Sequence, residues 1–216
     1  KVATLVASAE RLVGVGDRIV CLTGIDGSGA IDTVIVLDLG TEIEMFSDLT
    51  ADPLPEDVAP AVFERLLTLA SELGLEGREG RSVGTLFVVG DSDRVLAQSH
   101  QLVINPFQGY PECERNILDP RLEETIKEFS AIDGAFIIRG DGVILNAGRY
   151  LGPRGRLDEP LPQGLGTRHE AAACITVSTD AMALCVSQST GTISIFRRGR
   201  LVTDIQKPRG RHSDGL

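Results

Sequence analysis

The sequence has little cysteine and no long apolar run. Its four cysteines include no C-x-x-C pair: Cys21, Cys113, Cys174 and Cys185. Cys174 and Cys185 lie among apolar neighbours, which is typical of buried free thiols in a reducing compartment. No stretch reaches the length of a membrane span, and the first residues lack the basic-then-apolar order of a signal peptide. We therefore expect a cytoplasmic protein without a membrane partner.

Positive charge is also in short supply. The chain carries 31 acidic residues against 21 lysines and arginines, which leaves a formal net charge of −10. Because a surface of this sign repels a polyanion, we expect no nucleic acid among its partners. Any anionic ligand must then be bound by a local cluster of donors. His100 and His212 have no further ligands at the spacing of a zinc site, which argues against structural zinc.

Helix and strand patterns alternate along the chain, and they predict an α/β fold with a mixed central sheet flanked by helices. Runs of β-branched residues predict buried strands at 18–23, 32–40 and 85–89. An amphipathic helix is predicted to end at Gly74. Its apolar face consists of Val58, Val62, Leu66, Leu69 and Leu73.

The second half of the chain continues the alternation. Asp119 is predicted to cap a helix that starts at Pro120, and a hairpin with a Gly-Asp-Gly turn follows at 135–151. A helix is predicted at 167–178, and two or three strands come after it. We predict a smaller α/β unit at 1–50, a linker helix within 51–77, a larger domain at 78–205 and a disordered tail at 206–216.

The stretch "GLGTRHEAAA" places a hydroxyl and two cationic-capable side chains at a predicted helix start. A helix start offers unpaired backbone N–H groups and a partial positive charge. Thr167, Arg168 and His169 would add side-chain donors, so this turn is a candidate phosphate site. A structural interpretation is also open: Thr167 as N-cap and Glu170 three residues later would form a capping box. The two interpretations are compatible.

Two further signals are ordinary when taken alone. Asp133, followed by Gly134, lies between a predicted helix and a buried strand, where α/β proteins place metal ligands and catalytic bases. An Asp-Gly turn explains the same residues. Ser187 and Ser189 end a strand before a tight turn at Gly191, as in many hairpins.

Together these signals resemble the diadenylate cyclase (DAC) domain family, in order and in approximate spacing. The matching stretches are Asp133-Gly134-Ala135, Gly166-Thr167-Arg168-His169, and Val186, Ser187 and Thr190 to Ser194. The resemblance runs from about Arg78 to Val202. It includes "GRYLGP", with Tyr150 and Leu151 at the positions of the family's adenine pocket.

The resemblance implies an enzyme whose homodimer places two ATP-bound half-sites face to face. Each ribose 3′-hydroxyl would attack the other nucleotide's α-phosphorus, giving cyclic di-AMP and two pyrophosphates. Asp133 is implied as the catalytic carboxylate and as a ligand of Mg²⁺ or Mn²⁺. The implied ATP-binding residues are Gly134, Ala135, Tyr150, Leu151, Gly166, Thr167, Arg168, His169, Ser187 and Ser189.

The chain departs from the family pattern at two places. Glu170 replaces the last arginine of the usual R-H-R, and Gln188 and Ser189 replace the usual pair of glutamates. Since the second glutamate is a metal-site carboxylate in the family, the metal would rest on Asp133, phosphates and water, which Mg²⁺ tolerates. Two hypotheses stay open: an active cyclase, and a catalytically weakened nucleotide-binding or sensory module.

The N-terminal third carries a separate, short resemblance. "GDRIVCLTGIDGSGAIDTVIVLDLG" is similar to the closing strands of a pyruvate-kinase C-terminal-like domain, in which a glycine loop separates two strands. The resemblance implies a regulatory or oligomerising module ahead of the catalytic domain.

Overall fold

The computed structural model describes residues 7, 12–14, 16–24, 30–38, 54–78, 81–152, 157, 161–162 and 164–206. The chain divides into two units, Lys1–Leu54 and Pro55–Leu216. The predicted tail at 206–216 lies outside the described residues, apart from Gln206.

The described part of the first unit is a two-stranded antiparallel hairpin. β1 (Arg18–Thr23) pairs with β2 (Thr33–Asp38), and Arg18 forms an ion pair with Asp38 at 3.0 Å. Both strands were expected, but their predicted burial is wrong. Four apolar side chains on one face are each 54–64% exposed: Val20, Leu22, Val34 and Val36. An apolar run predicts a strand, but it does not show which other elements pack on it.

The second unit is built on a seven-stranded mixed sheet with the order β4-β6-β5-β3-β7-β8-β9. Only β3 and β5 pair in parallel within this sheet, and the other neighbours are antiparallel. The strands are β3 (Thr85–Val89), β4 (Ser99–Gln101), β5 (Ala135–Ile138), β6 (Ile144–Leu151), β7 (Met182–Val186), β8 (Ile193–Arg197) and β9 (Arg200–Ile205). The predicted mixed α/β fold is therefore confirmed.

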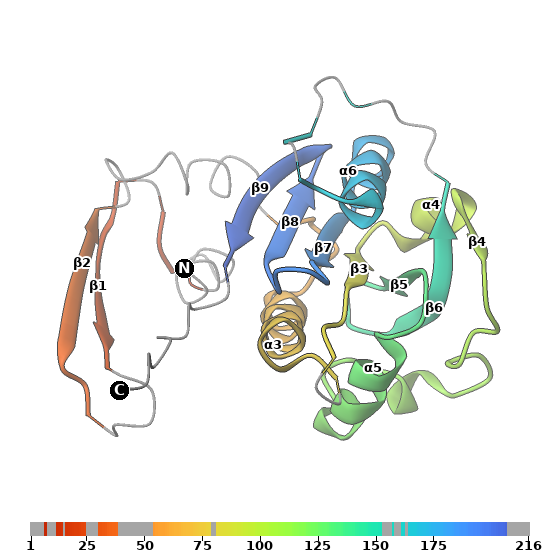
Figure 1. Cartoon of the computed structure of the whole chain (residues 1–216), viewed down its shortest axis with the longest axis horizontal. Helices are drawn as coiled ribbons and strands as arrows, with labels where there is room; N and C mark the ends of the chain where they lie inside the picture. The colour runs from red at the N-terminus through yellow and green to blue at the C-terminus, as the bar shows by residue number, and fades with distance from the viewer. Residues whose placement is uncertain are drawn as a thin grey trace, which may run out of the picture. The chain divides into compact units, whose positions relative to one another are not determined.

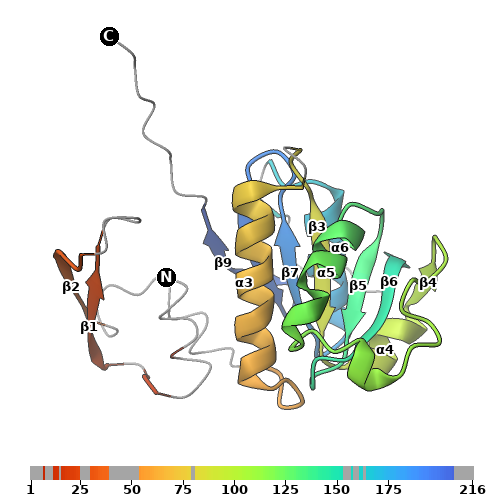
Figure 2. The same cartoon turned by 90° about the horizontal axis from the view of Figure 1, so that it is seen from below.

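Helices cover both faces of this sheet (Figures 1 and 2). The longer elements are α3 (Pro60–Glu76), α4 (Ser92–Ala97), α5 (Glu123–Phe129) and α6 (Thr167–Ser178), with short 3₁₀ turns η1 (Glu112–Glu114) and η2 (Pro120–Leu122). α3 and α5 lie on one face, whereas α4 and α6 lie on the other (Figures 1 and 2). Among the described residues, no helix combines the length and the apolar character needed to cross a membrane.

The predicted apolar face of α3 is buried throughout, but the predicted end of the helix is wrong. The helix passes through Gly74 and ends at Glu76. Its C-cap is Gly77, which has a φ of 65° and donates its N–H to the Leu73 carbonyl. Gly74 instead allows a close approach, because a Cβ there would lie 2.4 Å from the Gly191 carbonyl oxygen. The glycine with a positive φ, not the glycine that packs against Gly191, terminates the helix.

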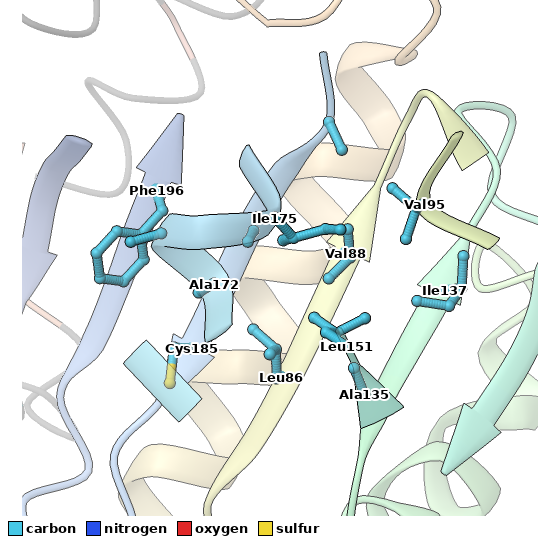
Figure 3. Packing of buried hydrophobic residues seen from close by; sticks show 13 residues of the cluster. Leu86, Val88, Val95, Ala135, Ile137, Leu151, Ala172, Ile175, Cys185 and Phe196 are labelled. Atoms are coloured by element: carbon cyan, nitrogen blue, oxygen red, sulfur yellow. The ribbon is translucent and has the colours of Figure 1, made fainter. Parts of the chain in front are cut away.

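The face under α4 and α6 forms a contiguous apolar core (Figure 3). Ala172 and Ile175 of α6 pack on Leu86 and Val88 of β3, and Val95 of α4 belongs to the same cluster. Small residues in α6 allow the helix to approach the sheet closely, as close packing in protein interiors requires. This packing fixes the position of the first turn of α6, where the candidate site begins.

Candidate active site

A cavity of about 580 Å³ lies beside the first two turns of α6. Its volume falls in the range of small-molecule sites. Six of the ten residues expected to bind ATP line it together with Asp133, the expected catalytic carboxylate: Gly134, Ala135, Tyr150, Leu151, Thr167 and Arg168. These residues come from three separate segments of the sequence, so the fold brings together most of the predicted site.

Asp133 lies at the start of β5 with its side chain 82% exposed. Gly134 follows with a φ of 100°, and a Cβ there would lie 2.5 Å from the backbone nitrogen of Arg149 on β6. The close approach of β6 therefore requires glycine at this position. Asp133 Oδ1 accepts a hydrogen bond from the Gly134 N–H at 3.0 Å, which fixes the carboxylate at the turn.

Arg168 reaches across the cavity towards this carboxylate. Its Nη2 lies 3.9 Å from Asp133 Oδ1, and its side chain is 35% exposed. No hydrogen bond from this guanidinium to another described residue competes with the ion pair. An exposed pair at this distance contributes little stability, so both groups are available to a ligand.

The helix start differs from the predicted capping box. Gly166 is the N-cap, Thr167 is already helical, and no side chain caps the helix. The N–H groups of His169 and Glu170 both donate to the Gly166 carbonyl. Since Gly166 is the N-cap, Thr167 lies in the first turn of the helix and lines the cavity instead of closing a cap. The phosphate-binding interpretation of this turn stays a prediction.

His169 lies away from the cavity. It is 6% exposed, and its ring meets Phe196 of β8 edge to face at a centroid distance of 6.1 Å. Burial lowers the pKa of His169, the Asp204 carboxylate raises it, and the Arg168 guanidinium lowers it further. The ring therefore packs against β8 and is not among the residues that line the cavity.

Ser187 and Ser189 also lie outside this cavity, together with Gly166. The two hydroxyl oxygens are 3.2 Å apart in the β7–β8 turn, which borders a smaller cavity of about 210 Å³ beside the end of α3. Gly84 lies between this turn and Arg168 of the main cavity. A Cβ at Gly84 would lie 2.8 Å from Gln188 Cβ and 3.1 Å from Arg168 Nη1.

The structure adds cavity residues that the sequence did not indicate. They are Leu86, Leu102, Arg149, Glu170, Ala171 and Cys174. Thr167, Glu170, Ala171 and Cys174 recur at helical spacing, so one face of α6 forms the wall. This periodicity could have identified Cys174, but Leu102 follows a three-residue edge strand and has no comparable signal.

The donor set suits a divalent cation that arrives with a nucleotide. Among the described residues, no group of three or more histidine, cysteine, aspartate or glutamate side chains is arranged to hold a metal. The carboxylates that line the cavity are those of Asp133 and Glu170. Mg²⁺ characteristically binds one or two carboxylates together with substrate phosphates and water, and Asp133 fits that role.

The fold is that of an α/β domain with a cavity beside a helix N-terminus. Residues 72–201 match the DAC family model, described as "DisA bacterial checkpoint controller nucleotide-binding". This match covers more than half of the chain, and the chain belongs to the DAC family.

Two curated relatives named "Diadenylate cyclase" are similar to most of the chain. The protein of Methanocaldococcus jannaschii is 40% identical over 81% of this chain and 55% of its own length. That of Haloferax volcanii is 36% identical over 92% of this chain and 71% of its own length. The chain thus spans about half of the first relative.

A solved structure supports the fold alone. A "hypothetical membrane spanning protein" from Bacillus cereus has a TM-score of 0.52 and 22% sequence identity. The match covers 76% of this chain and 71% of that chain.

Proposed function

We propose that this chain is a diadenylate cyclase, which condenses two ATP molecules into cyclic di-AMP and releases two pyrophosphates. Family membership and the names of the two relatives support this proposal. The structural observation that carries it is the 3.9 Å approach of Arg168 to Asp133 inside one cavity. An exposed carboxylate beside a cation at a helix start is what nucleotidyl transfer requires: a group to orient a hydroxyl and a group to bind phosphate.

The chain's own residues have distinct roles in this proposal. Asp133 accepts the hydrogen bond of the attacking 3′-hydroxyl and takes up its proton. Arg168 leaves its pairing with Asp133 and binds the phosphates, together with the Thr167 hydroxyl and the free N–H groups of the first turn. Leu151 and Tyr150 contact the base. A bound Mg²⁺ or Mn²⁺ would neutralise charge on the phosphates.

A second copy of the chain completes the reaction. The cyclic product contains two nucleotides, whereas we place one nucleotide in each cavity. Most of the Asp133 side chain is exposed, so that it is accessible to a nucleotide held by a facing copy. We therefore propose a catalytic homodimer, and we expect specific activity to rise with protein concentration at low concentrations.

A catalytically weakened nucleotide-binding or sensory module is the second candidate. Gln188 and Ser189 favour it, because they replace two glutamates and because Ser189 lies outside the main cavity. In this candidate the chain binds ATP through Arg168 and the first turn of α6 but forms no cyclic product.

Incubation of the protein with ATP and Mn²⁺ or Mg²⁺, followed by chromatography of the nucleotides, tests the two candidates. We expect cyclic di-AMP from the wild type and from Asp93→Asn, which changes an exposed aspartate on α4. Asp133→Asn should form none while it still binds ATP and melts like the wild type. Full turnover by Asp133→Asn would refute the mechanism, and ATP binding without product from the wild type would favour the sensory module.

A further inference from the structure

The edge strand β4 holds an aromatic ring against one wall of the cavity. His100 on β4 stands directly opposite Tyr150 on β6, and their ring centroids lie 4.9 Å apart at an interplanar angle of 38°. This distance is within the range of attractive aromatic pairs. Tyr150 is nevertheless 51% exposed, so the pair does not belong to the hydrophobic core.

The residues on either side of His100 tie β4 to its neighbours. The Ser99 hydroxyl donates to the Val95 carbonyl at 2.8 Å and accepts a hydrogen bond from Arg149 Nε at 2.7 Å. Gln101 Nε2 donates to the Ala147 carbonyl at 2.6 Å. These bonds anchor the strand through its first and third residues. The middle residue is therefore presented to Tyr150 on a fixed backbone.

The His100 imidazole has no hydrogen bond or ion pair with any described residue. Its ring contact is with the tilted ring of Tyr150. The hydrogen bonds that hold β4 in place therefore do not need a histidine at this position. Its position along the strand explains the contact, because directly paired residues of an antiparallel ladder have neighbouring Cβ atoms.

We propose that His100 is a positioning residue that holds the Tyr150 ring ready to stack on the base of the bound nucleotide. The proposal rests on the proposed function, since it assigns the base to the Tyr150 side of the same cavity. A half-exposed tyrosine samples several orientations unless a neighbour restricts it, and ordering its ring on binding weakens the complex. Because His100 already restricts the Tyr150 ring in the free protein, less conformational entropy is lost when the nucleotide binds.

The proposal predicts a defect that depends on the base. A ligand with phosphates alone uses the Arg168 side of the cavity and should not respond to His100. ATP contacts both the Arg168 side and the Tyr150 side of the cavity, so its affinity should fall when His100 is replaced. Inorganic tripolyphosphate is therefore the matched probe, because it carries the phosphate chain of ATP without ribose or adenine.

Calorimetric titration of ATP and of tripolyphosphate into the full chain tests this role in three variants. His100→Ala should weaken ATP binding about 2- to 10-fold, the range of one aromatic pair, and leave tripolyphosphate binding unchanged. His100→Phe should bind ATP like the wild type, because it keeps a ring. Tyr110→Ala, which removes a similarly exposed tyrosine from a loop outside the cavity, should match the wild type with both ligands. In turnover, His100→Ala should raise KM for ATP without lowering kcat.

Three results would overturn the proposal. They are unchanged ATP affinity in His100→Ala, an equal loss of ATP and tripolyphosphate binding, and a His100→Phe variant as weak as His100→Ala. The test does not depend on turnover. If the wild type makes no cyclic di-AMP and His100→Ala still weakens ATP alone, the cyclase proposal fails while the role of His100 stands.

Discussion

Gly84 lies against the guanidinium of Arg168, so that a Cβ at this position would stand 3.1 Å from Nη1. The same Cβ would lie 2.8 Å from Gln188 Cβ in the β7–β8 turn. The absence of a side chain at residue 84 thus lets a cationic side chain and a turn pack side by side at the edge of the cavity. This relationship makes position 84 a sensitive test of where Arg168 must lie.

Gly84→Ala should impair ATP binding through a displaced Arg168. We expect KM for ATP to rise about tenfold, because one charge-assisted hydrogen bond is worth roughly 1.5–3 kcal/mol and this substitution weakens it without removing it. The measurement is steady-state kinetics together with thermal melting. Gly14→Ala, where the nearest atom lies 3.9 Å from the added Cβ, is the control. A wild-type KM in Gly84→Ala would show that the position of Arg168 is not critical.

Glu170→Gln should strengthen nucleotide binding. The Glu170 carboxylate lines the cavity next to the proposed phosphate site. Its removal eliminates a like-charge repulsion, which for two unit charges about 8 Å apart in water is about 0.5 kcal/mol. We therefore expect about a twofold lower dissociation constant for ATP, with a smaller effect at high salt. Titration without and with Mg²⁺ distinguishes repulsion from metal binding. A variant that binds ATP more weakly only when Mg²⁺ is present would identify Glu170 as a metal ligand instead.

Cys174 should be protected from alkylation by ATP. It lines the cavity, and burial raises the pKa of its thiol, with a further rise from the Glu170 charge. Its reaction with N-ethylmaleimide should be slower than that of exposed Cys113, since the thiolate is the reactive form. ATP at ten times its dissociation constant should slow modification of Cys174 about tenfold and leave Cys113 unaffected. Peptide mass spectrometry measures both rates.

Cys185 provides an internal reference for that experiment. Burial raises the pKa of its thiol to about 12, and the residue is fully buried under α6. We expect it to remain unmodified in the folded protein with or without ATP. Equal modification of Cys174 in both conditions would mean that ATP binds elsewhere.

Acid should destabilise the second unit through His169. Its pKa in the folded state is lowered, mainly by burial, whereas an unfolded histidine titrates near 6.5. Between these two values the unfolded state binds more protons, so the free energy of unfolding falls as the pH drops through about 6.5. Urea unfolding of the wild type and of His169→Gln between pH 7.5 and 5.5 measures this effect. The variant should lose less stability over that range, and equal slopes would contradict the assignment.

Local patterns predicted the elements of the second unit well. The limits of β3 and α6 agree with the expected residues, because their β-branched run and small-residue helix are strong signals. The hairpin of β5 and β6 was also expected, from its Gly-Asp-Gly turn. The exposure of β1 and β2 was not predictable, because an apolar run does not show which other elements pack on it.

The candidate site could be predicted in part. The convergence of Asp133 and Arg168 followed from the family resemblance, and both residues line one cavity. The orientation of His169 towards Phe196 depends on the rotation of α6 about its axis, which packing on the sheet determines. The smaller cavity beside Ser187 depends on the contact between Gly74 and Gly191, two residues more than a hundred positions apart.

The N-cap of α6 illustrates a narrower limit. Thr167 with Glu170 fits the capping-box pattern, yet Gly166 is the cap. A shift of one residue is within the variation of helix limits, but here it decides whether Thr167 caps the helix or lies in its first turn beside the cavity.

α6 carries Arg168 in its first turn and fills the interior with Ala172 and Ile175 further along. The orientation of the cation is thus tied to how tightly the middle of the helix rests on β3. A substitution at one of the α6 residues that pack on the sheet can therefore rotate the Arg168 guanidinium away from Asp133, although that residue does not line the cavity. If the proposed function holds, selection for a well-packed interior and selection for phosphate binding act on the same twelve residues.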